Sequence, residues 1–290
     1  MDKLYAPTTI RRIKEKHNFR LSKSLGQNFL TDGNIVDKII ESCDAGPEDL
    51  VLEIGPGMGV LTAEAAKRAG KVVCVEIDRN LIPILKETLS EFSNVEVVNR
   101  DILKTDIAQL LCEHGKIGQA QAAGIKVIGN LPYYITTPII MKLLEEGVPC
   151  DSITIMLQKE VAQRIEAAPG SKIYGALSVA VQYYCQVVYV TTVPKEVFLP
   201  QPKVDSAVIQ LRLRRQKPVE LLEEALFFEV IKAGFGQRRK TLLNALTGLR
   251  GKNKEEIAQI LESAGIASMR RAETLSMEEF AAIANTVASK

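Results

Sequence analysis

The sequence has few of the features that mark metal-binding and disulfide-bonded proteins. Its five cysteines lie far apart and form no Cys-x-x-Cys pair, and its two histidines are not clustered. This pattern argues against a zinc site and against a disulfide framework. It favours buried free thiols in a reducing cytosol, so we expect a cytoplasmic protein without a metal cofactor.

Long apolar runs are also missing from the chain. No stretch approaches the roughly 18 apolar residues that a membrane-spanning helix needs. The N-terminus is too charged and too poor in apolar residues for a secretory signal peptide. We find no internal repeat and no coiled-coil pattern, so we expect a monomer that has no membrane partner.

The composition is that of a globular protein, but the charge is unevenly distributed. With 290 residues and 46% apolar side chains, the chain is long enough for one large domain and a small one. The formal net charge is only +2, yet the first 25 residues carry seven cations and two acids. Such an arm is a common contact for a phosphate backbone, although a solvated amphipathic helix has the same composition. The candidate RNA contacts in the arm are Arg11, Arg12 and Lys14.

Apolar runs that alternate with helical patterns predict a parallel sheet in the first two thirds of the chain. Continuous apolar strands are typical of sheets whose two faces are both covered by helices. The expected fold class is therefore α/β. The expected strands are residues 50–54, 71–77, 95–98, a run from 127 that stops at Asn130, and 152–157, and the expected helices are 32–42, 60–69, 80–89 and one that ends at 165.

The pattern changes toward the C-terminus. Residues 186–192 and 206–213 look like two strands joined by a proline-rich loop, which predicts an antiparallel pair at the edge of the sheet. The pattern after these strands is helical, so we place a domain boundary near Arg214. This gives a catalytic domain of residues 1–213 and an all-α, RNA-binding domain of residues 214–290. Helices are expected at residues 219–235, 240–246, 254–264 and 277–287, and a surface loop at 115–124.

A glycine-rich segment, Glu53 to Gly59, follows the first expected strand. Glycine lets backbone amides approach a ligand closely, and a helix start offers unpaired N–H donors. Dinucleotide enzymes use G-x-G-x-x-G, but here the third glycine comes one residue early and proline fills the first gap. The segment therefore favours a ligand without a pyrophosphate, such as S-adenosylmethionine, over a purely structural turn. Gly55 and Gly57 are the candidate cofactor contacts.

Carboxylates follow the next two strands. Glu76 ends the second strand, where a carboxylate accepts hydrogen bonds from both hydroxyls of an adenosine ribose. Asp78 points the same way in an extended chain and is the alternative. Asp101 follows the third strand and suits the adenine amine of the cofactor, although an aspartate in this place is also a common helix N-cap.

The segment Asn130-Leu131-Pro132-Tyr133 points to one reaction. The lone pair of an adenine N6 amine is delocalised into the ring, so the amine is a poor nucleophile. The side-chain oxygen of Asn130 and the carbonyl of Leu131 suit its two N–H groups, which favours a tetrahedral nitrogen aimed at a methyl donor. Pro132 keeps the preceding residue extended, and Tyr133 suits stacking on the base. A proline turn after a strand is the structural alternative.

Further candidates for contact with RNA lie later in the chain. Phe198 stands in a stiff, proline-rich loop, where it is a candidate either to sandwich an extruded base against Tyr133 or to pack in the core. Three successive cations lie at the start of an expected helix, where cations oppose the helix dipole. A phosphate partner is one reason for such a cluster, and a solvated face is the other. The candidate phosphate contacts in these regions are Lys203, Arg238, Arg239 and Lys240.

These motifs resemble those of the KsgA-type rRNA adenine N6-dimethyltransferases of the small ribosomal subunit, over nearly the whole chain. Residues 24–30 are similar to the family's cofactor-capping segment, which implies that Asn28 and Leu30 touch S-adenosylmethionine. Residues 198–204 are similar to the target-base loop. Residues 235–242 are similar to the small-subunit group and are not expected in the related enzymes of macrolide resistance.

The resemblance implies a fold, a reaction and a partner. The implied fold is the Rossmann-like sheet of class I S-adenosylmethionine-dependent methyltransferases with a small all-α C-terminal domain. The implied reaction is dimethylation of two adjacent adenosines in a hairpin loop near the 3′ end of small-subunit rRNA. The implied partner is the immature small ribosomal subunit. The loop of residues 112–124 looks longer than the family usually has.

Three other interpretations compete with this one. An NAD-dependent dehydrogenase shares the fold class but has neither this glycine spacing nor the Asn-Leu-Pro-Tyr segment. A large-subunit rRNA methyltransferase of the macrolide-resistance type shares the motifs but differs in the C-terminal part. A non-catalytic RNA-binding assembly or transcription factor on the same scaffold is expected to have lost Asn130, Tyr133 or Glu76, and all three are present.

Overall fold

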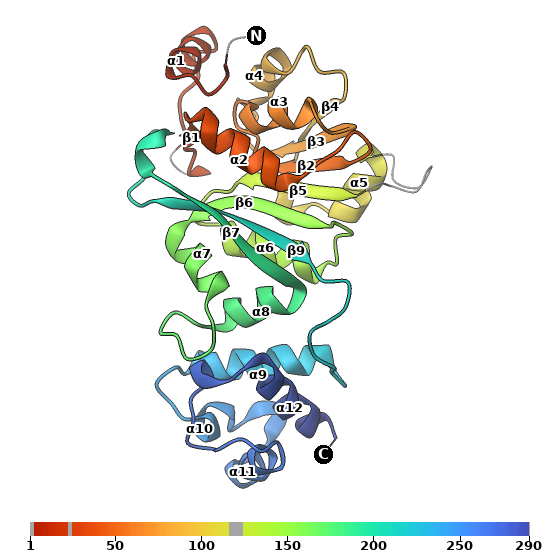
Figure 1. Ribbon diagram of the computed structural model, residues 1–290, viewed down its shortest axis with the longest axis vertical. Coiled ribbons are helices and arrows are strands. Elements are labelled where there is room, and N and C mark those ends of the chain that lie inside the picture. The colour runs from red at the N-terminus through yellow and green to blue at the C-terminus, as the bar shows by residue number, and fades with distance from the viewer. Residues whose placement is uncertain (1–2, 23–24, 116–123, 290) are drawn as a thin grey trace. The chain divides into compact units, whose positions relative to one another are not determined.

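The structure is a computed structural model that describes residues 3–22, 25–115 and 124–289 (Figure 1). These residues pack into two compact units, one built around a sheet and one made mainly of helices. Most of the loop expected at residues 115–124 lies outside the described residues. None of the helices within the described ranges is both long and apolar enough to cross a membrane.

The two units are not continuous in sequence. The first consists of Met1–Ala162 with Val188–Leu213, and the second of Gln163–Val187 with Arg214–Lys290. Sequence analysis assigned residues 163–187 to the first domain, but by packing they lie in the second unit. The reason is the packing of helix α8 (Ala176–Tyr184), whose buried residues Val179 and Tyr183 belong to the core of the C-terminal helices.

The described residues of the first unit are built around a seven-stranded sheet with the order β4-β3-β2-β5-β6-β9-β7. The first five strands in this order run parallel, and β9 pairs antiparallel with β6. The two C-terminal strands lie at one edge, and the expected Rossmann-like α/β class is confirmed. The strands are β2 (Leu50–Ile54), β3 (Lys71–Glu76), β4 (Val95–Asn99), β5 (Ile125–Asn130), β6 (Ser152–Gln158), β7 (Cys185–Val193) and β9 (Ser206–Leu213).

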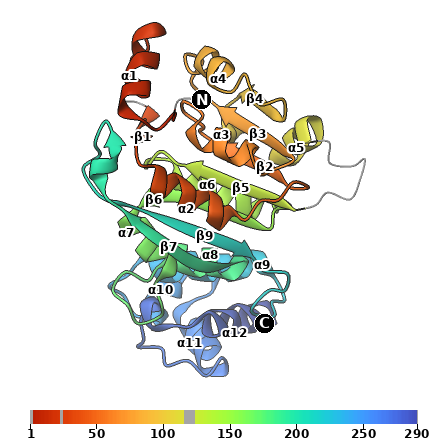
Figure 2. The same cartoon turned by 45° about the horizontal axis from the view of Figure 1, so that its top comes forward.

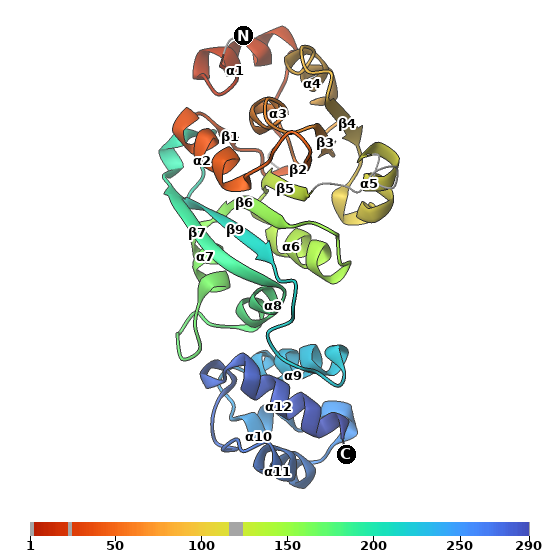
Figure 3. The same ribbon diagram turned by 45° about the vertical axis from the view of Figure 1, so that its right-hand side comes forward.

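Helices cover both faces of this sheet, with α2 and α3 on one face and α5 and α6 on the other (Figure 1 and Figure 3). Asp32 caps the N-terminus of helix α2, because its side chain accepts hydrogen bonds from the N–H groups of Asn34 and Ile35. Its residues Val36 and Ile39 are fully buried against the sheet. The helices of this region are α1 (Pro7–Lys16), α2 (Gly33–Cys43), α3 (Val60–Ala66), α4 (Ile82–Thr88), α5 (Ile107–Gly115), α6 (Thr136–Glu145) and α7 (Lys159–Glu166), which continues into the second unit.

A second, two-stranded sheet joins segments that are far apart in the sequence (Figure 2). Strand β1 (Phe29–Leu30) pairs antiparallel with β8 (Phe198–Leu199). Next to this pair, the N–H and the hydroxyl of Thr31 both donate to the carbonyl of Val197, at 2.8 and 2.9 Å. The segment that resembles a cofactor cap and the segment that resembles a target-base loop are therefore neighbours.

The second unit is a helical domain with its own apolar core. Phe227, Leu242, Ile257 and Phe280 come from four of its helices and are fully buried together. Helices α11 and α12 each begin with a capping box, in which the first residue and a glutamate three positions later cap one another's backbone N–H groups. Its helices are α8 (Ala176–Tyr184), α9 (Glu224–Gly236), α10 (Leu242–Leu246), α11 (Lys254–Ser263) and α12 (Met277–Ala288).

Helix α9 begins at Glu224 and not at residue 219, where the apolar pattern placed its start. The side chain of Asn285 accounts for the difference. Its Oδ1 accepts a hydrogen bond from the N–H of Leu222, and its Nδ2 donates to the carbonyl of Glu220, each at 2.9 Å. In a longer helix, the N–H of Leu222 and the carbonyl of Glu220 would belong to its first turn. Here the side chain of Asn285 is their hydrogen-bond partner instead.

Candidate active site

The order of the strands reverses at β2, which pairs with β3 on one side and with β5 on the other. In open α/β sheets, ligands bind outside the carboxyl ends of the strands at such a point. A cavity with about 1080 Å³ of empty space, part of it open to solvent, lies at this edge. Its walls come from the segments that follow β2, β3, β4 and β5, and from residues 25–30, which we call the capping segment.

The turn after β2 leaves room for a ligand against its backbone. Gly55 and Gly57 adopt φ values of +71° and +60°, which residues with a side chain rarely adopt. A Cβ atom placed on Gly55 would meet no atom within 4 Å, so the space beside its backbone is open. On Gly57 the same atom would lie 3.0 Å from Cε1 of Phe29 and would push against the capping segment. The turn at Gly55 and Gly57 therefore leaves room for a ligand against its backbone, and we call it the glycine cradle.

Glu76 is the carboxylate that faces the cavity. Its side chain is 5% exposed, and it accepts hydrogen bonds from the N–H of Asp78 at 2.8 Å and from the N–H of Gly57 at 3.3 Å. Burial raises the pKa of Glu76 to about 7, against the opposing effect of these backbone donors. Asp78, the alternative from the sequence, does not line the cavity and instead binds the side chains of Gln27 and Asn80.

Glu53, which sequence analysis did not select as a site residue, is a second buried carboxyl group on the cavity wall. It is 1% exposed, and its Oε2 has no hydrogen-bond partner among the described residues. Burial first, and the charge of Glu76 in addition, raise the pKa of Glu53 to about 8. A buried oxygen of this kind needs a donor from a ligand or from water. The available signal in the sequence was its position, just before the glycine-rich turn.

Asp101 lies on the cavity wall and also caps a short 3-10 helix. Its Oδ1 accepts a hydrogen bond from the N–H of Leu103 at 3.0 Å. Its Oδ2 lies 3.9 Å from Nζ of Lys104, whose side chain is 85% exposed. One oxygen is committed to the cap, and the other has only this distant partner, so Asp101 retains an acceptor for a ligand.

Asn130 ends β5 at the cavity, and its side-chain amide has a fixed orientation. Its Nδ2 donates a hydrogen bond to the backbone carbonyl of Asn28 at 2.9 Å. The amide nitrogen is thereby turned to the capping segment, and Oδ1 is the atom left to accept a hydrogen bond from a ligand. Asn28 itself donates from Nδ2 to the carbonyl of Gly26 at 3.1 Å.

Tyr133 lines the cavity with its hydroxyl group anchored. The hydroxyl lies 2.7 Å from Oγ of Ser206 in β9, and burial raises the pKa of Tyr133, so the phenol stays neutral. The turn before it is tied down as well, because the carbonyl of Pro132 accepts a hydrogen bond from the hydroxyl of Thr136 at 3.0 Å. Leu131 also lines the cavity, and it is 1% exposed.

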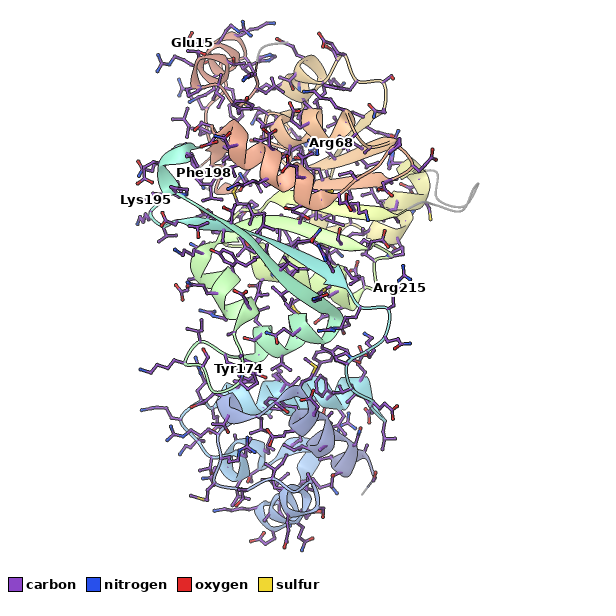
Figure 4. All side chains as sticks on the ribbon, viewed as in Figure 1. Glu15, Arg68, Tyr174, Lys195, Phe198 and Arg215 are labelled. Atoms are coloured by element: carbon purple, nitrogen blue, oxygen red, sulfur yellow. The ribbon has the colours of Figure 1, made fainter. Side chains whose placement is uncertain are left out.

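Phe198 does not lie in this cavity. Its side chain is 4% exposed and packs in the core with Leu30 and Val193, at the position labelled in Figure 4. Because side chains alternate along a strand, the neighbouring Leu199 is the more exposed residue, at 38%. The expected sandwich of a base between Phe198 and Tyr133 is not preformed here, and that role stays a prediction.

In the first unit, the predicted RNA contacts lie on two segments. Helix α1 buries its apolar face and carries Arg11 and Arg12 on the exposed one, with Lys14 half-buried. Lys203 is exposed in the loop after β8. No metal-binding group of three or more histidine, cysteine or acidic side chains occurs in the part of the chain that the structure describes.

In the second unit, the three successive cations after α9 have different surroundings. The guanidinium group of Arg238 donates to the carbonyls of Lys172 and Tyr174 at 2.8 and 3.3 Å, so it holds a loop of its own unit. Arg239 and Lys240 are exposed. Arg238 is exposed like its two neighbours but also binds these two carbonyls, and a contact of all three cations with RNA stays a prediction.

The fold and the cavity define a class of protein. A parallel sheet with an antiparallel edge, a glycine cradle after its first strand and a buried carboxyl group after the next are typical of S-adenosylmethionine-dependent methyltransferases. The open space at Gly55 and the unpartnered oxygen of Glu53 fit a cofactor that is rich in hydrogen-bond donors.

Relatives narrow this class to one family. Residues 18–289 match the family described as Ribosomal RNA adenine dimethylase, and the chain belongs to this family. It is 52% identical to Ribosomal RNA small subunit methyltransferase A of Clostridioides difficile (strain 630), over 100% of this chain and 99% of that protein. It is equally 52% identical to the protein of that name in Alkaliphilus metalliredigens (strain QYMF), over the full length of both. The resemblance indicated by the sequence motifs is confirmed.

Solved structures agree with this assignment. A dimethyladenosine transferase from Plasmodium falciparum matches with a TM-score of 0.73 and 26% identity, over 88% of this chain and 95% of that one. The 23S rRNA methyltransferase ErmE matches with a TM-score of 0.67 and 27% identity, over 90% and 99%. The protein is thus an rRNA adenine methyltransferase, and its cofactor is S-adenosylmethionine.

Proposed function

We propose that this chain dimethylates the N6 amines of two adjacent adenosines in a hairpin loop near the 3′ end of small-subunit rRNA. The observation that carries the proposal is the fixed amide of Asn130, whose Oδ1 is left as an acceptor at the cavity. The printed name of the two full-length relatives supports a small-subunit substrate. The proposed partner is the immature small ribosomal subunit in the cytoplasm, and the proposed acting form is a monomer without metal.

The residues at the end of β5 suit the chemistry of an adenine amine. An amine that donates both N–H groups, to Oδ1 of Asn130 and to the carbonyl of Leu131, becomes more nearly tetrahedral and regains a localised lone pair. This interaction is stronger in the transition state than in the planar ground state, which is the condition for lowering the barrier. Tyr133, held through its hydroxyl by Ser206, supplies a fixed ring for stacking on the base. As the nitrogen lone pair forms the new C–N bond, the bond between the methyl carbon and the sulfonium sulfur would break and its electron pair would stay on sulfur, leaving S-adenosylhomocysteine. The nitrogen then loses a proton to solvent.

The cofactor supplies an electrophilic methyl group when it is bound. The cradle of the glycine turn accommodates it beside the backbone, and the carboxylate of Glu76 accepts hydrogen bonds from ribose hydroxyls. Glu53 offers its unpartnered oxygen at the same wall. The residues proposed to hold S-adenosylmethionine are Asn28, Leu30, Gly55, Gly57, Glu76, Asp101 and Asn130, and all of them line the cavity.

Exposed cations are proposed to hold the RNA by its phosphates. They are Arg11, Arg12 and Lys203 in the first unit and Arg239 and Lys240 in the second, with Lys14 beside the first group. Phosphate contacts position a nucleic acid without reading its sequence, so the choice of adenosine falls to the cavity. Phe198 is proposed to act on the target base only after it leaves its packed position.

The test is incubation of the protein with labelled S-adenosylmethionine and unmethylated small ribosomal subunits, followed by nucleoside analysis of the rRNA. We expect N6,N6-dimethyladenosine in small-subunit rRNA. Label that appears only with large-subunit rRNA would contradict the proposed substrate and favour an activity of the ErmE kind. Absence of label with either RNA would contradict catalysis and leave a non-catalytic RNA-binding factor on the same scaffold.

A further inference from the structure

The side chain of Gln27 joins the capping segment to the main sheet, in addition to the pairing of β1 with β8. Its Nε2 donates a hydrogen bond to Oδ2 of Asp78 at 2.8 Å, and its Oε1 accepts one from the N–H of Ser22 at 2.9 Å. Asp78 is 6% exposed and follows β3, so this bond joins the capping segment to the sheet across 51 residues of sequence. Both functional groups of the glutamine amide are therefore in use.

Asp78 has no freedom to turn away from this bond. Its other oxygen, Oδ1, accepts hydrogen bonds from both the backbone N–H and the Nδ2 of Asn80, each at 3.0 Å. A carboxylate whose two oxygens are bound to separate partners is fixed in orientation. The position of Gln27 is thus set by the turn after β3. The last residue of β3 is Glu76, the carboxyl group proposed to bind the cofactor.

One residue after Gln27, the backbone acts on the amide of Asn130. The carbonyl of Asn28 accepts the hydrogen bond from Asn130 Nδ2 at 2.9 Å. The oxygen and nitrogen ends of a primary amide are nearly equal in shape, so only their hydrogen-bond partners decide which end faces the cavity. If the carbonyl of Asn28 moves away, the amide is free to turn its donor end toward a substrate that itself needs an acceptor.

We propose that Gln27 and Asp78 are positioning residues for methyl transfer. Their hydrogen bond places the carbonyl of Asn28, and that carbonyl keeps Oδ1 of Asn130 facing the substrate amine. The inference deepens the proposed function and rests on the role proposed for Asn130. Neither side chain needs to touch the adenine, because the effect passes through the backbone of the capping segment.

Exchanging donor and acceptor tests this arrangement. Gln27→Glu removes the donor and sets two carboxylates against one another, so we expect turnover to fall about 10- to 100-fold, the range for a misplaced catalytic group. Asp78→Asn alone brings two amide donors together and has the same effect. In the double variant Gln27→Glu/Asp78→Asn the bond re-forms in the opposite direction, while Ser22 and Asn80 keep their acceptors. We expect turnover within about threefold of the starting protein.

A spectroscopic measurement separates positioning from a general loss of structure. Protein labelled with ¹⁵N-asparagine gives side-chain amide signals, and the signal of Asn130 is identified by its loss in Asn130→Ala. We expect this signal to shift in Gln27→Glu and in Gln27→Ala, and to return in the double variant. Gln109→Glu is the matched control, because Gln109 donates to the carboxylate of Glu113 at 2.7 Å on an exposed helix face away from the cavity.

The outcomes are distinct. Loss of turnover and a shifted Asn130 signal in the single variants, both reversed in the double variant, support the inference. An unmoved Asn130 signal in Gln27→Glu overturns it, and so does a double variant that stays as slow as the singles. Full turnover in Asn130→Ala overturns the role proposed for Asn130 and the catalytic part of this inference but leaves the proposed reaction standing, whereas absence of methyl transfer in the starting protein overturns the proposed function itself.

Discussion

The two units use their charged side chains in different ways. In the second unit, charged groups complete local structure, as where Arg250 donates to the carboxylates of both Glu223 and Glu229. In the first unit, Glu53 and Glu76 are buried at the cavity, and within the described ranges neither has a cationic partner. Buried ionisable groups without an oppositely charged partner mark the place where a ligand can supply hydrogen-bond partners.

The comparison also separates two kinds of polar network. The polar bonds of the helical unit stabilise its own packing, in capping boxes, in exposed ion pairs and in the bonds of Asn285 to the segment before α9. The polar groups of the cavity are held by partners far away in sequence, such as Asn28 and Asn130, which are 102 residues apart. Catalysis is therefore expected to be sensitive to changes in the second kind, whereas changes in the exposed ion pairs of the first kind should leave it unchanged.

The largest expected effect is that of Asn130→Ala. Removing the acceptor takes away an interaction made in the transition state, so we expect methyl transfer to fall about 100- to 1000-fold. Affinity for S-adenosylmethionine and RNA should stay within a few-fold. The measurement is single-turnover methyl transfer together with equilibrium binding. Asn244→Ala, which removes an exposed amide bound to Thr241 in the second unit, is the control and should leave methyl transfer unchanged.

The next effect is on stability and depends on pH. The pKa of Glu53 is raised from 4.5 to about 8 in the folded protein, so the folded state holds a proton that the unfolded state has released. The contribution of Glu53 to stability is greatest below about pH 4.5 and is lost as the pH rises to about 8, with an upper bound of roughly 5 kcal/mol. Glu76 adds a change of the same sign, between pH 4.5 and about 7.

Glu53→Gln should remove most of this pH dependence, because a neutral amide has no proton to lose. Denaturant unfolding of the cofactor-free protein at several pH values between 5 and 9 measures it. A slope as steep in Glu53→Gln as in the starting protein would contradict the assignment to Glu53. Glu255→Gln, on an exposed turn of the second unit, serves as the control substitution and should keep the full slope.

A smaller effect is expected on RNA binding, and it should differ between the cations of the second unit. The double variant Arg239→Ala/Lys240→Ala is expected to weaken RNA binding about tenfold and to lower the slope of log affinity against log salt by about 2. Arg238→Ala should instead lower the stability of the second unit, because its hydrogen bonds to the carbonyls of Lys172 and Tyr174 are lost. RNA binding as a function of salt, alongside thermal unfolding, distinguishes the two. Equal effects of both variants on the salt slope would mean that Arg238 contacts RNA phosphates as Arg239 and Lys240 do.

The smallest effect is expected from Arg250→Ala. The ion pairs of Arg250 with Glu223 and Glu229 are solvent-exposed, and such pairs contribute little. We expect thermal unfolding to shift down by a few degrees at most and methyl transfer to stay unchanged. A large loss of activity would mean that the second unit takes part in catalysis through its own surface.

Much of the fold follows from sequence patterns, because buried parallel strands are continuous apolar runs. The strands at residues 50–54, 71–76 and 152–158 were placed to within a residue or two. Helix α8 was not predicted, because its nine residues are apolar on most sides and lack the periodicity of an amphipathic helix. The start of α9 was misplaced, because a side chain 65 residues away, that of Asn285, binds its leading segment.

The candidate site divides in the same way. Glycines and strand-end carboxylates are fixed by their position after a strand, so Gly55, Glu76 and Asp101 were found from spacing alone, and all three line the cavity. Phe198 and Arg238 show the limit of this reasoning. Whether a side chain points into a cavity, into the core or onto a neighbouring carbonyl depends on contacts that the local sequence does not contain.

The pairing of β1 with β8 has a consequence for the order in which the protein is completed during synthesis. Leu30 lies opposite Phe198, so the ribosome must add 168 further residues before the partner of Leu30 exists. At ordinary elongation rates this takes about 8 to 35 s. Once residues 55–59 have been added, the nascent chain carries the glycine turn without the β1–β8 pair until Phe198 has been made. The cofactor pocket is therefore finished late, when nearly all of the sheet that surrounds it has already left the exit tunnel.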